Sequence, residues 1–300
     1  MDWLELSTRA EAETVEAIAE IFQQHGQGVA IEEPVVAEPD ESYHIDYTLP
    51  VRITTYLPLD RYAEERRQRI EGALHWLGLL RPIEPVEVRQ LAEADWENAW
   101  KRHFFVRHVG KRLVIVPSWR RYRPKAGDVV LDLDPGMAFG TGVHPTTRLC
   151  LHLLERYLTP DARVLDLGTG SGILAIAAAK LGAARVTAVD LDATAARVAA
   201  ENVARNEVED VVDVAERELG GVDRAARFEL ILANINLRVI RAVLPTLAAR
   251  LAPTGVAILS GVLQEHEATL AEAVREAGLR RTDRRRERDW LAVAVQHATT

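Results

Sequence analysis

The segment from Val164 to Ile173 constrains the fold most, because it reads Val-Leu-Asp-Leu-Gly-Thr-Gly-Ser-Gly-Ile. A short apolar run followed by closely spaced glycines predicts a buried strand, a tight turn and then a helix. Gly168, Gly170 and Gly172 leave no side chain where the backbone passes close to a ligand. The turn therefore predicts a binding site, with a turn that needs glycine for packing alone as the alternative.

The spacing of these glycines argues against a dinucleotide. The dinucleotide fingerprint reads G-x-G-x-x-G/A after a strand. Here the glycines follow the pattern G-x-G-x-G, and Ile173 stands where that fingerprint has Gly or Ala. A nicotinamide cofactor is therefore disfavoured.

From about residue 129 the chain alternates between strand and helix patterns, which is typical of an α/β sheet with crossover connections. The run Leu230-Ile-Leu-Ala is apolar throughout, as in strands that are covered on both faces. We expect strands over 164–167, 185–190, 211–215, 228–235, 255–260 and 291–295, and helices near 146–158, 171–181, 192–206, 238–252 and 264–277.

An acidic residue ends the strand that follows the glycine-rich turn. Asp190 closes the run Arg-Val-Thr-Ala-Val-Asp and lies 22 positions after Gly168. An acidic side chain at that place accepts hydrogen bonds from the hydroxyls of a ribose. A helix N-cap is the alternative role for Asp190, but Asp192 can fill it. The turn holds no Lys or Arg for a phosphate, which fits a nucleoside that carries a sulfonium.

The strand, the turn, the helix and the acidic strand end together resemble the class I S-adenosylmethionine-dependent methyltransferases over residues 161–260. The resemblance implies S-adenosyl-L-methionine as the cofactor. It also implies a Rossmann-like, seven-stranded, mostly parallel sheet within residues 126–300. The residues that it places at the cofactor are Gly168, Gly170, Gly172 and Asp190.

Asn234 lies near the carboxyl end of the strand expected over 228–235. An amide there accepts a hydrogen bond from a substrate amine and holds its lone pair toward the methyl group. Methyltransferases of adenine or of glutamine amides have Asn-Pro-Pro-Tyr at this place, with the aromatic ring stacked on a planar substrate. This chain continues with Ile235, Asn236 and Leu237, which favours an aliphatic amine. A plain loop cap is the alternative role for Asn234.

Residues 1–92 follow a different pattern, in the order strand, helix, strand, strand, helix, strand. This βαββαβ order predicts a small ferredoxin-like α+β domain. Residues 93–125 are expected to be a connector with one strand, Arg112–Val116, ahead of a second domain over 126–300.

Charge is divided unevenly along the chain. Residues 1–95 hold 8 Lys and Arg against 20 Asp and Glu, a net charge of −12, whereas residues 96–300 carry +4. Such an acidic segment repels nucleic acid and attracts a basic protein, with a solvated surface as the alternative. One Cys in 300 residues excludes a disulfide framework and a cysteine-based zinc site, so we expect no metal. The apolar runs are too short to span a membrane and no secretory signal is visible, which indicates a cytoplasmic protein.

A longer string runs from Asp134 to Thr147 and reads Asp-Pro-Gly-Met-Ala-Phe-Gly-Thr-Gly-Val-His-Pro-Thr-Thr. With Asn234 in Ala-Asn-Ile, with Asp95-Trp-Glu-Asn-Ala-Trp-Lys and with Leu113-Val-Ile-Val-Pro-Ser-Trp, it closely resembles the methyltransferases of ribosomal protein eleven of the large subunit. The resemblance covers most of the chain. It implies that the cofactor is bound by Thr147, Gly168, Asp190 and Asn234.

The resemblance implies N-methylation of the α-amino group and of lysine ε-amino groups of ribosomal protein eleven, with Asn234 as the catalytic residue and residues 1–92 recognising the substrate. We expect a monomer, no membrane partner, and RNA contacts that do not dominate. An RNA or small-molecule N-methyltransferase on the same core is one alternative, although the acidic N-terminal part disfavours RNA. A non-catalytic cofactor-binding module is the other, and the intact turn, Asp190 and Asn234 count against it.

Other residues favour structural roles. His144 has no partner carboxylate in view, and Thr146 and Thr147 sit where residues that cap a helix belong. Cys150 lies on the apolar face of its helix and is expected in the core. The run Arg280–Arg288 holds six arginines and is expected to guard an exposed strand, with RNA contact as the alternative.

Overall fold

A computed structural model describes the protein over residues 2–32, 34–37, 43–45, 49–92, 105–133 and 144–298. The chain divides into two compact units, residues 1–105 and 106–300. This division falls inside the segment that the sequence predicts as a connector, so each unit holds a part of it. No helix within the described ranges is both long and apolar enough to cross a membrane.

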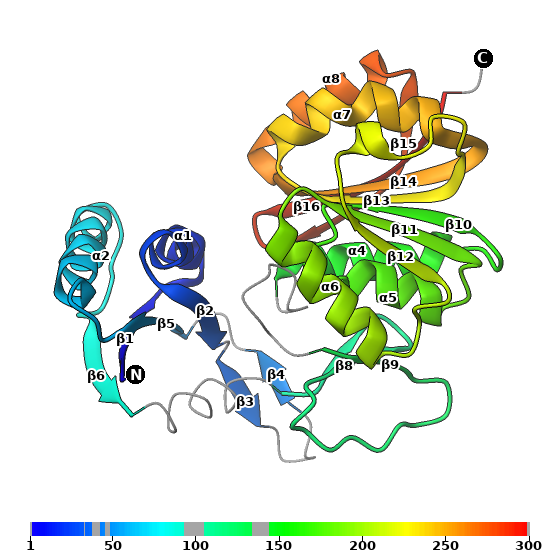
Figure 1. The fold of residues 1–300 in the computed structure, drawn as a ribbon. Coiled ribbons are helices and arrows are strands. Elements are labelled where there is room, and N and C mark those ends of the chain that lie inside the picture. Colours follow the sequence, from blue (N-terminus) through cyan, green and yellow to red (C-terminus); the bar gives the residue numbers. More distant parts are fainter. Residues whose placement is uncertain are drawn as a thin grey trace. The chain divides into compact units, whose positions relative to one another are not determined.

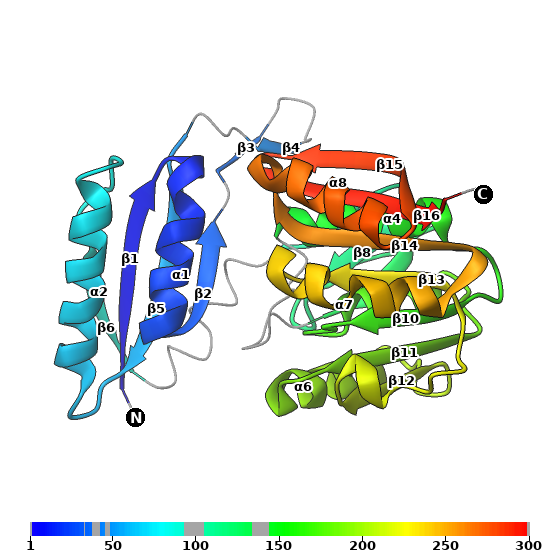
Figure 2. The same ribbon diagram turned by 90° about the horizontal axis from the view of Figure 1, so that it is seen from above.

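The first unit contains a four-stranded antiparallel sheet with the order β2-β5-β1-β6, and two helices lie along it (Figure 2). Its succession of elements confirms the predicted ferredoxin-like domain. A short hairpin of β3 and β4 was not predicted. The elements are β1 (Trp3–Ala10), α1 (Val15–His25), β2 (Gln27–Glu32), β3 (Val35–Ala37), β4 (Tyr43–Ile45), β5 (Val51–Pro58), α2 (Ala63–Gly78) and β6 (Glu87–Leu91).

The core of the first unit forms between its helices and its sheet. α1 presents Ile18 and Phe22, one helical turn apart, and both side chains are fully buried. They pack with Leu6 and Ile53 from the sheet and with Ile70 from α2. The helical spacing of apolar residues in the sequence is therefore what directs α1 onto the sheet.

The second unit is built on a seven-stranded sheet with the order β12-β11-β10-β13-β14-β16-β15. The strands from β12 to β14 are parallel, and β16 runs antiparallel to both of its neighbours. The predicted α/β fold with a mostly parallel, seven-stranded sheet is confirmed. The strands are β10 (Arg163–Leu167), β11 (Arg185–Asp190), β12 (Val212–Glu216), β13 (Phe228–Asn234), β14 (Leu251–Leu263), β15 (Leu279–Glu287) and β16 (Trp290–His297).

Helices cover both faces of this sheet (Figure 1). Successive side chains of a strand belong to different cores: Val164 packs with α4 and α5, whereas Leu165 packs with α7 and α8. Burial on both faces explains why the strands read as apolar runs rather than as alternating patterns. On one face lie α4 (Pro145–Tyr157), α5 (Ile173–Lys180) and α6 (Ala193–Arg205), and on the other α7 (Leu237–Arg250) and α8 (Glu267–Glu276).

The described part of the predicted connector belongs largely to the second unit. β7 (Arg107–Val109), β8 (Leu113–Val116) and β9 (Val129–Asp132) form a three-stranded sheet, whose apolar side chains join the core around α4 and α5. Glu155 of α4 accepts hydrogen bonds from the backbone N–H groups of residues 111, 112 and 113 at 2.8–3.2 Å. The prediction of one strand in the connector was wrong, because β7 is too short to show an alternating pattern. Residues 93–104 lie outside the described residues.

The arginine-rich run forms most of β15, the edge strand of the seven-stranded sheet. Its sequence does not predict a strand, because it lacks the apolar residues that mark one. Glu267 of α8 forms ion pairs with Arg281, Arg284 and Arg286 at 2.5–2.8 Å. A charged edge strand resists pairing with other chains, which agrees with the predicted protective role.

Candidate active site

A cavity of about 660 Å³ opens where β10, β11 and β13 end. The three strands are neighbours in the sheet, and Gly168, Asp190 and Asn234 lie at their carboxyl ends. All three residues line the cavity. The structure therefore brings together the turn, the acidic strand end and the amide that the sequence indicates separately. Parallel α/β sheets bind their ligands at this edge.

The turn between β10 and α5 needs glycine for geometric reasons. Gly168, Gly170 and Gly172 have φ angles of +70°, +56° and +83°, a region that L side chains rarely adopt. A Cβ on Gly168 would lie 2.5 Å from Cγ2 of Ile235. The N–H of Gly168 donates to the backbone oxygen of Val189 at 2.8 Å, which holds the turn against β11. Gly168 lines the cavity, whereas Gly170 and Gly172 shape the turn without lining it.

Both carboxylate oxygens of Asp190 are oriented by backbone N–H groups. Oδ2 accepts a hydrogen bond from Gly170 at 2.9 Å, and Oδ1 accepts one from Asp192 at 3.0 Å. Asp192 itself caps α6 by accepting a hydrogen bond from the N–H of Thr194 at 2.8 Å. The prediction that Asp192 is the helix cap is confirmed, and Asp190 remains at the cavity.

Asn234 joins the end of β13 to the start of α4. Its Nδ2 donates to the hydroxyl of Thr147 at 3.5 Å, and Thr147 is fully buried and does not line the cavity. Oδ1 of Asn234 is buried and has no hydrogen-bond partner among the described residues. A buried acceptor without a donor costs free energy. The amide oxygen is therefore suited to a donor that a ligand brings.

Asp166 lies beneath the turn and is buried. Burial raises the pKa of its carboxyl to about 7, and the charge of Asp190 acts in the same direction. The hydroxyl of Thr169 donates to Oδ2 of Asp166 at 2.6 Å, which opposes that rise. Asp166 does not line the cavity, so these contacts indicate that it supports the turn.

The start of α4 differs from the sequence prediction. The N-cap is His144 rather than Thr146 or Thr147, and its Nδ1 accepts a hydrogen bond from the N–H of Thr146 at 3.3 Å. The ring of His144 meets that of Trp290 edge to face, with centroids 4.9 Å apart. An imidazole nitrogen here takes the role that a threonine hydroxyl was expected to fill. Residues 134–143 of the predicted motif lie outside the described residues.

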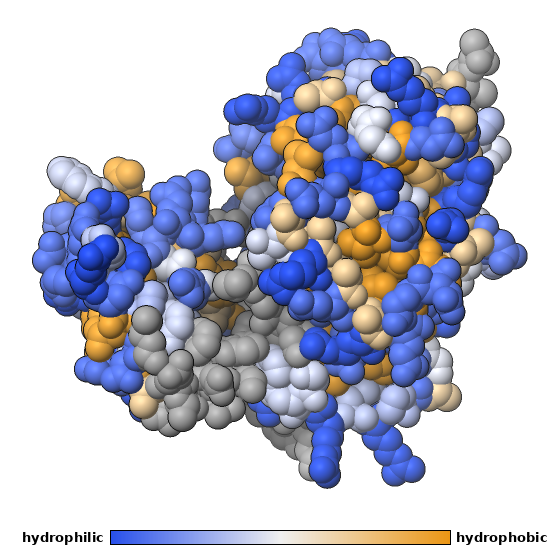
Figure 3. Space-filling view, viewed as in Figure 1, coloured by the Kyte–Doolittle hydropathy of each residue, from blue (hydrophilic) through white to orange (hydrophobic). Residues whose placement is uncertain are grey.

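Apolar residues that the sequence analysis did not single out form part of the cavity wall. They include Leu191, Leu219, Val239 and Trp290. Leu191 directly follows Asp190 and is 69% exposed, so an apolar residue after an acidic strand end was an available signal. No such signal marked Trp290, which is distant in the sequence. Figure 3 shows apolar side chains at the surface over α7, amid mostly hydrophilic ones.

Cys150 is not part of this site. Cys150 is fully buried, and burial raises the pKa of its thiol to about 12. A thiol that stays protonated is a poor nucleophile, and its position in the core agrees with the prediction. Within the part of the chain that the structure describes, no group of His, Cys, Asp and Glu is arranged to hold a metal ion.

The strand order with one reversed strand, the glycine-rich turn and the acidic strand end define a class I methyltransferase. The model of the family described as "Ribosomal protein L11 methyltransferase (PrmA)" matches residues 2–298. The chain belongs to this family, which confirms the resemblance seen in the sequence.

Individual relatives agree with this assignment. Ribosomal protein L11 methyltransferase of Chloroflexus aurantiacus is 47% identical, and the alignment covers 97% of each chain. The protein of the same name from Herpetosiphon aurantiacus is 44% identical over 97% of this chain and 98% of its own. A crystal structure of the ribosomal protein L11 methylase from Lactobacillus delbrueckii subsp. bulgaricus is 34% identical. It superposes with a TM-score of 0.61 over 65% of this chain and 100% of its own.

Proposed function

We propose that the protein transfers methyl groups from S-adenosyl-L-methionine to the α-amino group and to lysine ε-amino groups of ribosomal protein L11. One observation carries the proposal: Gly168, Asp190 and Asn234 line a single cavity at the ends of three adjacent strands. The substrate is proposed from the shared name of relatives that are 44–47% identical over almost the whole chain.

The residues of the cavity fit S-adenosylmethionine. The carboxylate of Asp190, fixed by two backbone N–H groups, accepts hydrogen bonds from ribose hydroxyls in this proposal. Gly168 keeps the backbone open beside Ile235, and Leu191 and Leu219 offer apolar walls to a base. When bound, the cofactor supplies a methyl group on a positively charged sulfur. Of the residues predicted to bind the cofactor, we assign direct contacts to Gly168, Asp190 and Asn234, which line the cavity. Thr147, Gly170 and Gly172 do not line it, and we assign to them the support of those contacts.

Asn234 is assigned the orientation of the amine. A lysine ammonium has no lone pair, and with a pKa near 10.4 only about one in a thousand is neutral near pH 7.4. Partial burial of the bound substrate amine favours its neutral form, because removal from water disfavours the charged ammonium. Oδ1 of Asn234, buried and without a partner among the described residues, then accepts a hydrogen bond from the amine and directs its lone pair. The Asn234 amide is not a base. The proton that the substrate ammonium loses before methyl transfer therefore passes to water.

Recognition of the substrate is assigned to residues 1–92, and methyl transfer to the second unit, which contains β7 and β8 of the predicted connector over 93–125 as well as residues 126–300. Residues 1–95 carry a net charge of −12, which attracts a basic ribosomal protein. The same charge disfavours RNA, so RNA contacts are not expected to dominate binding. We further propose that the enzyme works as a monomer in the cytoplasm.

The test is incubation of the full chain with labelled S-adenosylmethionine, total ribosomal proteins and ribosomal RNA, followed by mass spectrometry of both the proteins and the RNA. We expect label on the α-amino group and on lysines of ribosomal protein L11. Label on ribosomal RNA instead would favour an RNA N-methyltransferase on the same core. Label on neither polymer would contradict both functions.

A further inference from the structure

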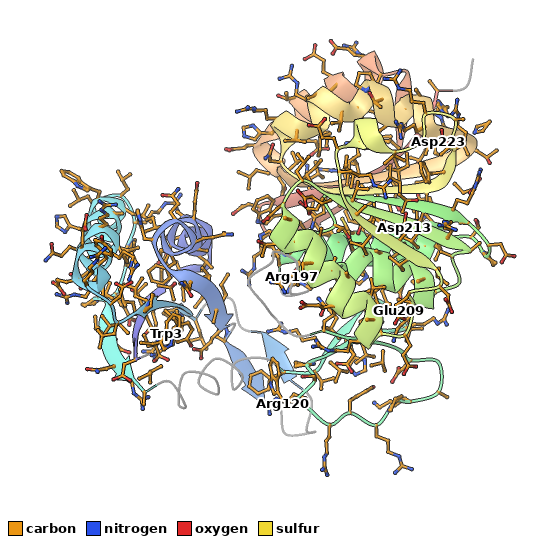
Figure 4. All side chains as sticks on the ribbon, viewed as in Figure 1. Trp3, Arg120, Arg197, Glu209, Asp213 and Asp223 are labelled. Carbon is orange, nitrogen blue, oxygen red and sulfur yellow. The ribbon has the colours of Figure 1, made fainter. Side chains whose placement is uncertain are left out.

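The glycine-rich turn is also held from the side of α6. Nδ2 of Asn202 donates to the backbone oxygen of Ser171 at 2.8 Å, and both residues are more than nine-tenths buried. One helical turn earlier, Ala199 lies so close that a Cβ on Gly172 would be 3.3 Å from it. The opposite, solvated side of α6 carries Arg197 (Figure 4). The inner side of α6 therefore contacts the turn by packing and by one directed hydrogen bond.

A second asparagine anchors the same end of α6. Oδ1 of Asn206 accepts a hydrogen bond from the N–H of Asp132 at 2.9 Å, and its Nδ2 donates to the oxygen of Asp132 at 2.7 Å. The same Nδ2 donates to the backbone oxygen of Asn202 at 2.8 Å. The end of β9, the end of α6 and the turn after β10 are thus joined in one network.

The turn depends on such a tether for two reasons. The helical hydrogen bonds of α5 begin with the oxygen of Gly172, so the oxygen of Ser171 lies outside that ladder. Glycine also has more conformational freedom than other residues, and it occupies positions 168, 170 and 172 of this turn. A donor fixed on a helix therefore adds a further restraint to the hydrogen bonds by which Val189 and Asp190 hold this segment.

We infer that Asn202 is a positioning residue for the cofactor. Its side-chain Nδ2 donates to the backbone oxygen of Ser171. By holding Ser171 in place, Asn202 keeps the neighbouring Gly170 in hydrogen-bond contact with Asp190. Asn202 does not line the cavity, so it acts through the turn rather than by touching a ligand. The inference rests on the proposed function, because it takes the cavity to be the site of S-adenosylmethionine.

Two substitutions test the hydrogen bond that Nδ2 of Asn202 donates to the turn. Asn202→Ala removes it, and Asn202→Asp keeps the shape while turning an acceptor toward the oxygen of Ser171. We expect calorimetric titration to show about tenfold weaker binding of S-adenosylmethionine by Asn202→Ala, and at least as large a loss for Asn202→Asp. The KM for the cofactor should rise by a similar factor, whereas kcat at saturating cofactor stays within about twofold, because no reacting group is touched.

Val203→Ala is the matched control, since Val203 is buried on the same helix and packs in the core. It should lower the melting temperature and leave the cofactor affinity unchanged. The inference is overturned if both Asn202 variants bind like the unaltered chain, or if Val203→Ala loses as much affinity. An unaltered chain that does not bind S-adenosylmethionine would instead refute the proposed function.

Asn206→Ala provides a gentler variant should the Asn202 substitutions prevent folding. It keeps the donor on Asn202 and removes its anchor to Asp132. We then expect a smaller loss of cofactor affinity, about twofold to fivefold, and an unchanged affinity would overturn the inference.

Discussion

Asp190 and Gly170 are joined by a hydrogen bond of 2.9 Å, in which a carboxylate at the end of β11 accepts from the middle of the turn after β10. The second carboxylate oxygen accepts from the N–H of Asp192. Protein groups alone therefore set the orientation of this carboxylate. Such preorganisation reduces the entropy that is lost when a ligand binds.

Asp190→Ala should weaken S-adenosylmethionine binding by about tenfold or more, because it removes the proposed ribose acceptor and one tether of the turn. Calorimetric titration measures the change directly. Asp192→Ala is the matched control, since Asp192 caps α6 and does not line the cavity. It should cost about 1 kcal/mol of stability through the lost cap and leave the affinity intact. Unchanged binding by Asp190→Ala would remove Asp190 from the site.

Asn234→Ala should lower kcat more than it weakens binding of the protein substrate, because an orienting contact matters most during transfer. Some loss of cofactor affinity is also expected from its proposed place at the cofactor. Thr147→Val keeps the shape of Thr147 and removes the hydroxyl that meets Nδ2 of Asn234 at 3.5 Å. Its effect on kcat should have the same direction and be smaller, because the contact is long. Full turnover by Asn234→Ala in steady-state assays would show that the amide has no role in transfer.

The α/β core could be predicted from sequence because its signals are local. The strand over 185–190 was predicted at its observed bounds, since an apolar run that ends on Asp190 is visible without any tertiary knowledge. β15 carries the opposite signal, because arginines fill the run and its stability comes from pairing with β16 and from Glu267. Such a strand is specified by its neighbours rather than by its own periodicity.

The candidate site, like the fold, could be predicted from the sequence only where its residues follow a local pattern. Gly168, Asp190 and Asn234 each follow a strand, so the topology of a parallel sheet was enough to bring them to one edge. Trp290 enters the cavity wall from the last strand, and Asn202 reaches the turn from the far end of α6. Neither has a distinctive local pattern, because its role depends on a contact across many residues of sequence.

The buried Asp166 predicts a specific dependence of stability on pH. Its pKa in the folded protein is about 7, against an ordinary value of 3.8, and burial is the main cause. Between about pH 4 and pH 7 the folded chain holds a proton that the unfolded chain has released. The free energy of unfolding therefore falls as pH rises through this window, by at most about 1.4 kcal/mol per pH unit from this group. Above the folded pKa this contribution stays constant.

Asp166→Asn isolates this contribution, because an amide has a similar shape and does not titrate in that range. Denaturant unfolding of both chains at several pH values gives the difference in their free energies of unfolding. We expect the stability of Asp166→Asn, relative to the unaltered chain, to increase from pH 4 to pH 7 and then level off. Titration of other groups cancels in the difference. A difference that stays flat with pH would show that Asp166 ionises normally in the folded state.

A truncated chain of residues 93–300 tests whether residues 1–92 recognise the protein substrate while the rest of the chain binds the cofactor. It retains Gly168, Asp190 and Asn234, so it should bind S-adenosylmethionine with an affinity close to that of the full chain. It should lose methylation of ribosomal protein L11, because the acidic part that is proposed to hold the substrate is missing. The affinity of isolated residues 1–92 for that substrate should weaken as salt rises, since exposed charges are screened over about 8–10 Å near physiological ionic strength.

The result that decides between recognition and a merely solvating role is the kcat/KM of the truncated chain. Apolar contacts also contribute to protein interfaces, so a weak salt dependence would only reduce the share that is assigned to charge. Cofactor binding by the truncated chain serves as its own control for folding. If that chain binds S-adenosylmethionine and methylates ribosomal protein L11 as efficiently as the full chain, then residues 1–92 do not recognise the substrate. Their net acidity would then contribute to solubility alone.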